Sequence, residues 1–174
     1  MRRILRACVM TLIVAGAPLA ASAQTAIADE VRPGVMSAGA FVGGELDNAD
    51  NWLTFGADVR VQMARGLELN PRFTFRPLDN GSIREIDANV LKNLELAQPG
   101  RIRPFAGIGG AVRTVSPEGF PSETKVGLNL VSGARIAMSS GAGYEPFFQA
   151  QYTIVQNQLN TFAFVVGASF KLRH

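Results

Sequence analysis

Hydrophobic and polar residues alternate along most of this chain, and the pattern is clearest at its C-terminal end. The stretch TFAFVVGASFKLRH, residues 161–174, carries apolar side chains at alternate positions: Phe162, Phe164, Val166, Ala168, Phe170 and Leu172. A period of two is that of a β-strand, because successive side chains of a strand point to opposite faces. The pattern therefore predicts a strand with one strongly apolar face.

The same alternation recurs in seven earlier segments, separated by turn signals such as Asp79-Asn80-Gly81-Ser82. The segments are 35–46, 51–63, 67–78, 82–96, 101–115, 124–138 and 144–155. Most contain about ten residues or more, whereas strands of ordinary globular proteins average about five or six. An even number of consecutive antiparallel strands can close on itself and leave no free edge. We therefore predict an all-β fold, an eight-stranded antiparallel up-and-down β-barrel.

Alternation alone fits two barrels, a membrane barrel with its apolar face outside and a soluble lipocalin-like barrel with that face inside. Strand length favours the transmembrane barrel, since a tilted spanning strand needs roughly 9–11 residues. Aromatic residues near the strand ends are typical of the girdles at membrane interfaces. They are Trp52, Phe55, Tyr144, Phe162 and Phe170.

The composition of the polar face decides between these barrels in favour of the membrane. This face combines many glycines with charges of both signs at mid-strand, as a narrow and crowded interior requires. The predicted lumen charge network consists of Asp58, Arg60, Arg72, Arg76, Glu85, Asp87, Arg113 and Arg135. Glu45, Glu68 and Glu145 supply further opposing charges. Buried charges need partners, so we expect ion pairs across the lumen.

These features predict a closed, salt-bridged interior, since eight strands enclose about the volume that side chains alone can fill. The corresponding function is a structural or interaction role in a membrane. A narrow pore for small solutes and a soluble periplasmic ligand-binding barrel are the alternatives.

The N-terminal stretch MRRILRACVMTLIVAGAPLAASAQ has three arginines, then an apolar run, then the small-residue site Ala21-Ser22-Ala23. This arrangement is typical of a secretory signal peptide, so we expect residues 1–23 to be removed before Gln24. Residues 24–34 are then a periplasmic N-terminal segment, and residues 35–174 form the barrel domain.

Removal of the signal peptide changes the charge balance. The full chain has 17 Lys and Arg against 14 Asp and Glu, and three of the arginines precede Gln24, which leaves 17 − 3 = 14 against 14. A formally neutral chain has no net positive charge to attract nucleic acid, so we expect no such partner. The only cysteine, Cys8, leaves with the signal peptide, so the mature chain has no disulfide or thiolate site.

Candidate chemistry is sparse. Hydrolytic catalysis of the serine type needs a histidine base, and the only histidine is the terminal His174. Asp47 and Asp50 are loosely spaced acids in a predicted loop, and Gly107–Gly110 opens no helix that could hold phosphate. We therefore expect a protein that is not an enzyme and that has no cofactor or metal.

The segment VVGASFKL resembles the C-terminal assembly signal of the small outer-membrane β-barrels of Gram-negative bacteria, the OmpA membrane-domain and opacity-protein type. The matching residues are Gly167, Phe170 and Leu172, although Arg173 and His174 follow here where family members usually end on the aromatic. The resemblance implies a monomeric protein of the cell outer membrane. It also implies contact with outer-membrane lipid and recognition by the barrel-assembly machinery.

Overall fold

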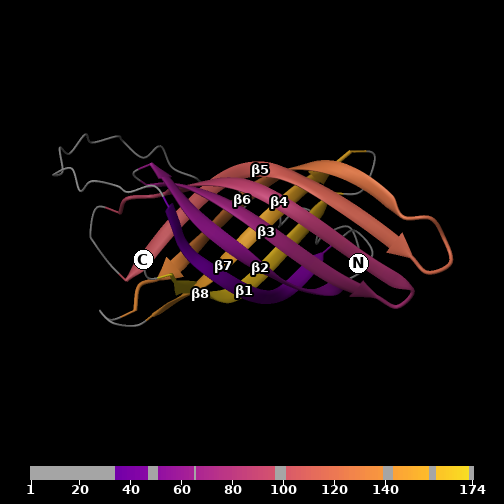
Figure 1. Cartoon of the computed structure of the whole chain (residues 1–174), viewed down its shortest axis with the longest axis horizontal. Helices are drawn as coiled ribbons and strands as arrows, with labels where there is room; N and C mark the ends of the chain where they lie inside the picture. Colours follow the sequence, from indigo (N-terminus) through magenta and orange to yellow (C-terminus); the bar gives the residue numbers. More distant parts are fainter. Residues whose placement is uncertain are drawn as a thin grey trace, which may run out of the picture. The chain divides into compact units, whose positions relative to one another are not determined.

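The computed structural model describes residues 34–46, 51–64, 66–96, 101–138, 143–156 and 160–172. Within these ranges the chain forms eight strands (Figure 1): β1 Gly34–Leu46, β2 Asn51–Ala64, β3 Leu67–Leu78, β4 Gly81–Asn93, β5 Ile102–Pro117, β6 Glu123–Ile136, β7 Tyr144–Val155 and β8 Thr161–Lys171. The described residues include no helix long and apolar enough to cross a membrane. The predicted signal peptide, residues 24–33, Arg173 and His174 lie outside these ranges.

The strands form a closed barrel in which each strand pairs with the next and β8 returns to β1. The closing β1–β8 pair is antiparallel and runs from Ser37 opposite Lys171 to Leu46 opposite Phe162. The predicted antiparallel barrel is thereby confirmed. The largest boundary difference concerns β4, which we predicted to reach residue 96 and which ends at Asn93, where its pairing with β5 also ends.

The turn between β3 and β4 follows its sequence signal. Asp79 and Asn80 form a two-residue connection, and Gly81 has a φ of 138°, which favours glycine over residues with a side chain. A Cβ at this position would also lie 2.9 Å from the Cα of Pro117 on β5. The glycine of the turn signal is therefore required both by the backbone angle and by the neighbouring strand.

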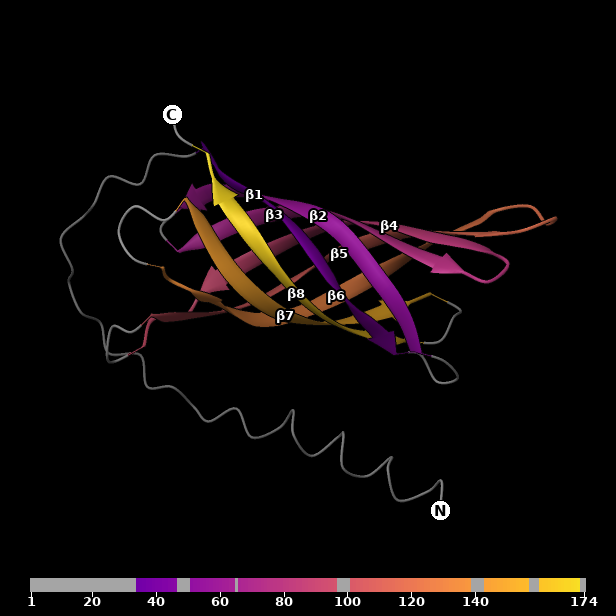
Figure 2. The same cartoon turned by 90° about the horizontal axis from the view of Figure 1, so that it is seen from below.

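At one end of the barrel, two hairpins extend further than the other strands. We call the end that holds Gly34 and Leu172 the termini end, and the end with the β3–β4 and β5–β6 connections the loop end. Pairing between β2 and β3 begins only at Phe55 opposite Phe75, whereas β3–β4 and β5–β6 continue beyond this level. Figures 1 and 2 show these two hairpins extending past the other strands. We call this extension, Phe75–Leu78, Gly81–Arg84, Thr114–Pro117 and Glu123–Val126, the β3–β6 wall.

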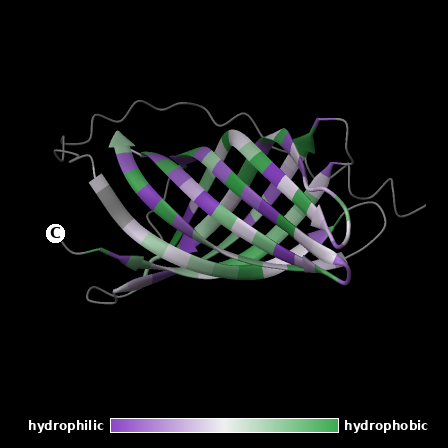
Figure 3. Ribbon diagram, turned by 45° about the vertical axis from the view of Figure 1, so that its right-hand side comes forward, coloured by the Kyte–Doolittle hydropathy of each residue, from purple (hydrophilic) through white to green (hydrophobic). Residues whose placement is uncertain are grey.

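The apolar face of the strands lies outside the barrel, and the alternation is visible along each ribbon (Figure 3). Ile108 and Leu128 on this exterior are 65% and 66% exposed, while the charged side chains of the opposite face are buried. The soluble lipocalin-like alternative is therefore wrong, because it requires a polar exterior. Of the predicted girdle aromatics, Phe55, Tyr144, Phe162 and Phe170 are exposed, but Trp52 shares the strand face of the buried Thr54.

Candidate functional site

All eight residues of the predicted lumen charge network are buried inside the barrel. They come from five adjacent strands, β2 to β6, and the buried acids Glu45, Glu68 and Glu145 come from β1, β3 and β7. The structure divides these side chains into two ionic clusters at different levels of the lumen. Amide and apolar side chains lie between the clusters along the strands.

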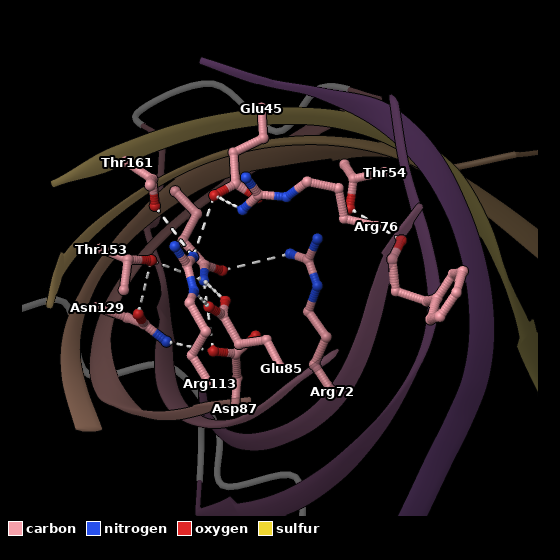
Figure 4. Close-up of polar contacts among 12 residues, drawn as sticks. Glu45, Thr54, Arg72, Arg76, Glu85, Asp87, Arg113, Asn129, Thr153 and Thr161 are labelled. Atoms are coloured by element: carbon pink, nitrogen blue, oxygen red, sulfur yellow. Dashed lines mark hydrogen bonds and ion pairs between the residues drawn. The ribbon is translucent and has the colours of Figure 1, made fainter. Parts of the chain in front are cut away.

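The first cluster lies toward the loop end and consists of Glu45, Arg76, Glu85 and Arg113 (Figure 4). The carboxylate of Glu45 forms ion pairs with Arg76 and with Arg113, the latter at 3.1 Å. Arg113 also donates from Nε to Glu85, and from its terminal nitrogen to the Thr161 hydroxyl at 3.1 Å. One arginine thus joins two acids and a hydroxyl, so the loop-end cluster is a shared network.

Asp87 lies on the termini side of this cluster, and amide side chains hydrogen-bond its carboxylate. Asn129 donates to its carboxylate at 2.7 Å, and Gln151 approaches the same oxygen at 3.5 Å. Thr153 in turn donates to Asn129 at 3.0 Å. Among the described residues no cation lies within ion-pair distance of Asp87, so the pairing that we expected for this acid is wrong.

Arg72, one of the arginines of the predicted network, is held by other partners. Its guanidinium carbon lies 3.8 Å from the centroid of the Phe41 ring, and it donates to Gln151 at 3.4 Å. A cation over an aromatic face is an attractive contact that strengthens when water is excluded. Arg72 is therefore held by an aromatic ring and an amide, and Asp58 likewise accepts from the amide of Asn70 at 2.9 Å.

The second cluster lies toward the termini end and contains two separate ion pairs. Arg135 contacts both carboxylate oxygens of Glu68, at 3.1 and 2.8 Å, and Asn93 hydrogen-bonds both partners at 2.8 Å. Arg60 pairs with Glu145 at 3.2 Å. Arg103, with a side chain that is 63% exposed, approaches Glu145 at 3.8 Å. Each buried arginine of this termini-end cluster thus has an acid of its own.

Two apolar groups also occupy the lumen, and sequence reasoning missed them. One contains Phe41, Phe147 and Val165, and the other Leu91, Phe105 and Val131. Their signal lay in the pairing, since each lumen phenylalanine is directly opposite a glycine on a neighbouring strand. The pairs are Phe41 with Gly56, Phe105 with Gly133 and Phe147 with Gly167.

These glycines provide the space that the rings occupy. A Cβ added to Gly133 would lie 2.6 Å from Cζ of Phe105, and one at Gly167 would lie 2.6 Å from Cζ of Phe147. Such separations are far below van der Waals contact, so a larger residue would displace the ring. The glycines of the polar face, which suggested a crowded interior, therefore have individual aromatic neighbours.

The predicted assembly residues occupy both faces of β8. Phe170 and Leu172 lie on the exterior, 57% and 45% exposed, whereas Gly167 has the parity of the buried Val165 and faces the lumen. The three residues therefore do not form one surface.

The arrangement brings charges of both signs together inside the barrel. Among the described residues no group of three or more His, Cys, Asp or Glu side chains could hold a metal ion. The carboxylates are engaged by arginines and amides. These contacts are therefore ion pairs and hydrogen bonds between lumen side chains.

No protein-family model and no curated protein matches the chain. Solved structures do match. Neisserial surface protein A (NspA) has 12% identity and a TM-score of 0.62 over 79% of this chain and 96% of that one. The N-terminal β-barrel domain of Pseudomonas aeruginosa OprF has 12% identity and a TM-score of 0.59 over 81% and 100%. A de novo designed transmembrane β-barrel has 14% identity and a TM-score of 0.54 over 82% and 98%.

These likenesses show the fold alone, and they confirm the resemblance to the small eight-stranded outer-membrane barrels. The apolar exterior and buried polar interior of this chain agree with that fold. The chain thus has the architecture of an integral membrane β-barrel. A designed protein shares this architecture, so the fold by itself assigns no biological role.

Proposed function

We propose that this protein is an integral outer-membrane β-barrel with a closed lumen and a structural or interaction role that is not enzymatic. The observation that carries the proposal is the set of buried ion pairs that cross the lumen. Arg113 on β5 reaches Glu45 on β1, and Arg135 on β6 reaches Glu68 on β3. Because these strands are not neighbours, the side chains extend through the interior where an open channel would hold water.

The exterior supports insertion into lipid. Outward residues of all eight described strands are largely apolar, and charged side chains at mid-strand are confined to the lumen. In water this surface would be a very large exposed apolar patch, which soluble proteins avoid. The likeness to outer-membrane barrels supports that membrane as the location.

The β3–β6 wall supports an interaction role. It rises past the other strands, and Phe120 in its β5–β6 connection is 75% exposed. Aromatic side chains are common anchors in protein interfaces. A serine-hydrolase mechanism would need His174, the only histidine of the sequence, as its base.

The narrow-pore alternative is separated from this proposal by conductance. Protein with heat-modifiable gel mobility, which reports a folded barrel, is inserted into planar bilayers. We expect no stable conductance of the size expected of an open porin. Stable channels from the unaltered protein would contradict the closed lumen. A variant with Glu68→Gly and Arg135→Gly, which removes one bridge, is the control that shows whether opening can be detected.

A further inference from the structure

At the base of the β3–β6 wall, the outward face of β3 to β6 changes from apolar to polar in successive cross-strand rows. One row is wholly apolar: Phe73, Ile86, Val112 and Val126. The next row toward the loop end is Phe75, Arg84, Thr114 and Thr124, and the following one contains Pro77, Ser82 and Ser116. The lipid-facing surface therefore ends at the row that contains Arg84.

Arg84 is distinguished by its position. It is exposed, and among the described residues it is the only lysine or arginine on the outward face at the loop end. The other exposed lysines and arginines of the described chain, such as Arg101, lie at the termini end. A cation at the edge of an apolar membrane surface lies at the level of the lipid headgroups.

The neighbouring strands place hydroxyl residues in the same row as Arg84 and in the next row, and these two rows contain no acid. Thr114 is the direct cross-strand neighbour of Arg84, and its hydroxyl lies 3.0 Å from that of Thr124. In the next row, the hydroxyls of Ser116 and Ser122 lie 2.9 Å apart. A guanidinium with adjacent hydroxyl donors is suited to the oxygens of a phosphate.

We propose that Arg84, with Thr114 and Thr124, binds the phosphate of an anionic lipid headgroup in the leaflet at the loop end. The occupant is a lipid because the patch continues directly from the lipid-facing row below it, which would contact the acyl chains of the same molecule. The inference rests on the proposed membrane insertion and adds a lipid class to it.

Binding is measured on the folded full-length barrel in phosphatidylcholine nanodiscs, with phosphatidic acid as the probe and native mass spectrometry to count bound lipid. Arg84→Gln should weaken retention of phosphatidic acid about fivefold, the effect of one cation near a membrane surface. Arg84→Lys should keep most of the retention. Arg101→Gln removes an exposed cation at the other end and is the matched control, for which we expect no change.

Two results would overturn the proposal: unchanged retention in Arg84→Gln, or equal losses in Arg84→Gln and Arg101→Gln, which would indicate general charge attraction. Inorganic phosphate could also displace the bound phosphatidic acid as effectively as added free phosphatidic acid does. That result would assign the site to phosphate itself and overturn the proposal that the ligand is a lipid. Thr114→Val offers a second variant with nearly unchanged shape, and it should also weaken retention. Heat-modifiable mobility and nanodisc incorporation report insertion separately, so failure of the membrane proposal would be recognised without lipid counts.

Discussion

The two ends of the lumen neutralise similar charges in different ways. At the termini end, Glu68 forms an ion pair with Arg135, and Glu145 forms one with Arg60. The exposed Arg103 is a second, more distant cation for Glu145. At the loop end, Arg113 forms ion pairs with both Glu45 and Glu85, and Glu45 also forms an ion pair with Arg76. The termini-end cluster is a set of pairs, whereas the loop-end cluster is a chain of shared contacts.

This difference predicts how many charged residues lose a partner when one residue of a cluster is replaced. Removing one partner of a buried ion pair is costly mainly because the remaining charge is left without compensation. In a separate pair, deletion of the second partner removes that charge and most of the cost. In the shared network, deletion of the two central members, Glu45 and Arg113, leaves both Arg76 and Glu85 without their ion-pair partners. The loop end should therefore tolerate paired replacements less well than the termini end.

The largest effect is expected for Arg113→Met combined with Glu45→Gln. This double variant leaves Glu85 without its arginine and Arg76 without its acid, so it should lose about 3–5 kcal/mol of unfolding free energy. The matched double variant Glu68→Gln with Arg135→Met removes a complete pair and should lie within about 1 kcal/mol of the unaltered barrel. Urea unfolding in lipid vesicles, followed through the fluorescence of Trp52, measures both. Equal losses would show that the two clusters do not differ.

A smaller effect is expected for a single arginine with an alternative cation nearby. Arg60→Met leaves Glu145 with Arg103, which lies 3.8 Å away, so we expect a loss of about 1.5–3 kcal/mol, the range for one charged hydrogen bond. Adding Arg103→Gln to this variant should increase the loss, whereas Arg103→Gln alone should have little effect. The same urea unfolding measures all three variants. If the double variant is no less stable than Arg60→Met, Arg103 does not act as the second cation.

The apolar groups of the lumen provide a third test, because one of them packs against the termini-end cluster: the guanidinium carbon of Arg135 lies 4.6 Å from the centroid of the Phe105 ring. Gly133→Ala would place a methyl group against Phe105 and against the carbonyl oxygen of Phe148, so we expect a loss of about 1–3 kcal/mol. Gly110→Ala is the control on the exterior, where the nearest atom to a new Cβ is 3.9 Å away. If Gly133→Ala and Gly110→Ala lower the unfolding midpoint equally, the loss comes from replacing any strand glycine and not from contact with Phe105.

The strands and their faces were predictable from sequence because each follows from alternation and turn signals. The burial of Arg113 or Asp87 followed from their parity on a strand face. Their partners did not follow, because partners across the lumen depend on how pairing registers accumulate around the barrel. Arg72 shows the limit, since the sequence offers it several acids and the structure places it over Phe41. The lumen phenylalanines were missed because only charged residues and glycines were assigned to the lumen, and Phe41, Phe105 and Phe147 were placed on neither face.

The smallest effect concerns the exterior of β8, where Phe170 lies near the termini end and Phe162 near the loop end. Burial in lipid predicts comparable losses of about 2 kcal/mol or less for Phe170→Ala and Phe162→Ala on refolding into pure lipid vesicles. If Phe170 and Leu172 are also read by the barrel-assembly machinery, Phe170→Ala should slow insertion into membranes that contain the machinery more than Phe162→Ala does.

Gly167, the third residue of the predicted signal, should behave differently from both phenylalanines. Gly167→Ala would displace the Phe147 ring inside the lumen, so this variant should refold poorly into pure lipid as well. Its defect would then report packing and not recognition, although all three residues belong to one sequence motif. Insertion half-times with and without the machinery separate the two causes. Equal defects for Phe170→Ala and Phe162→Ala in both membranes would remove the recognition role and leave lipid burial as the reason for the apolar face of β8.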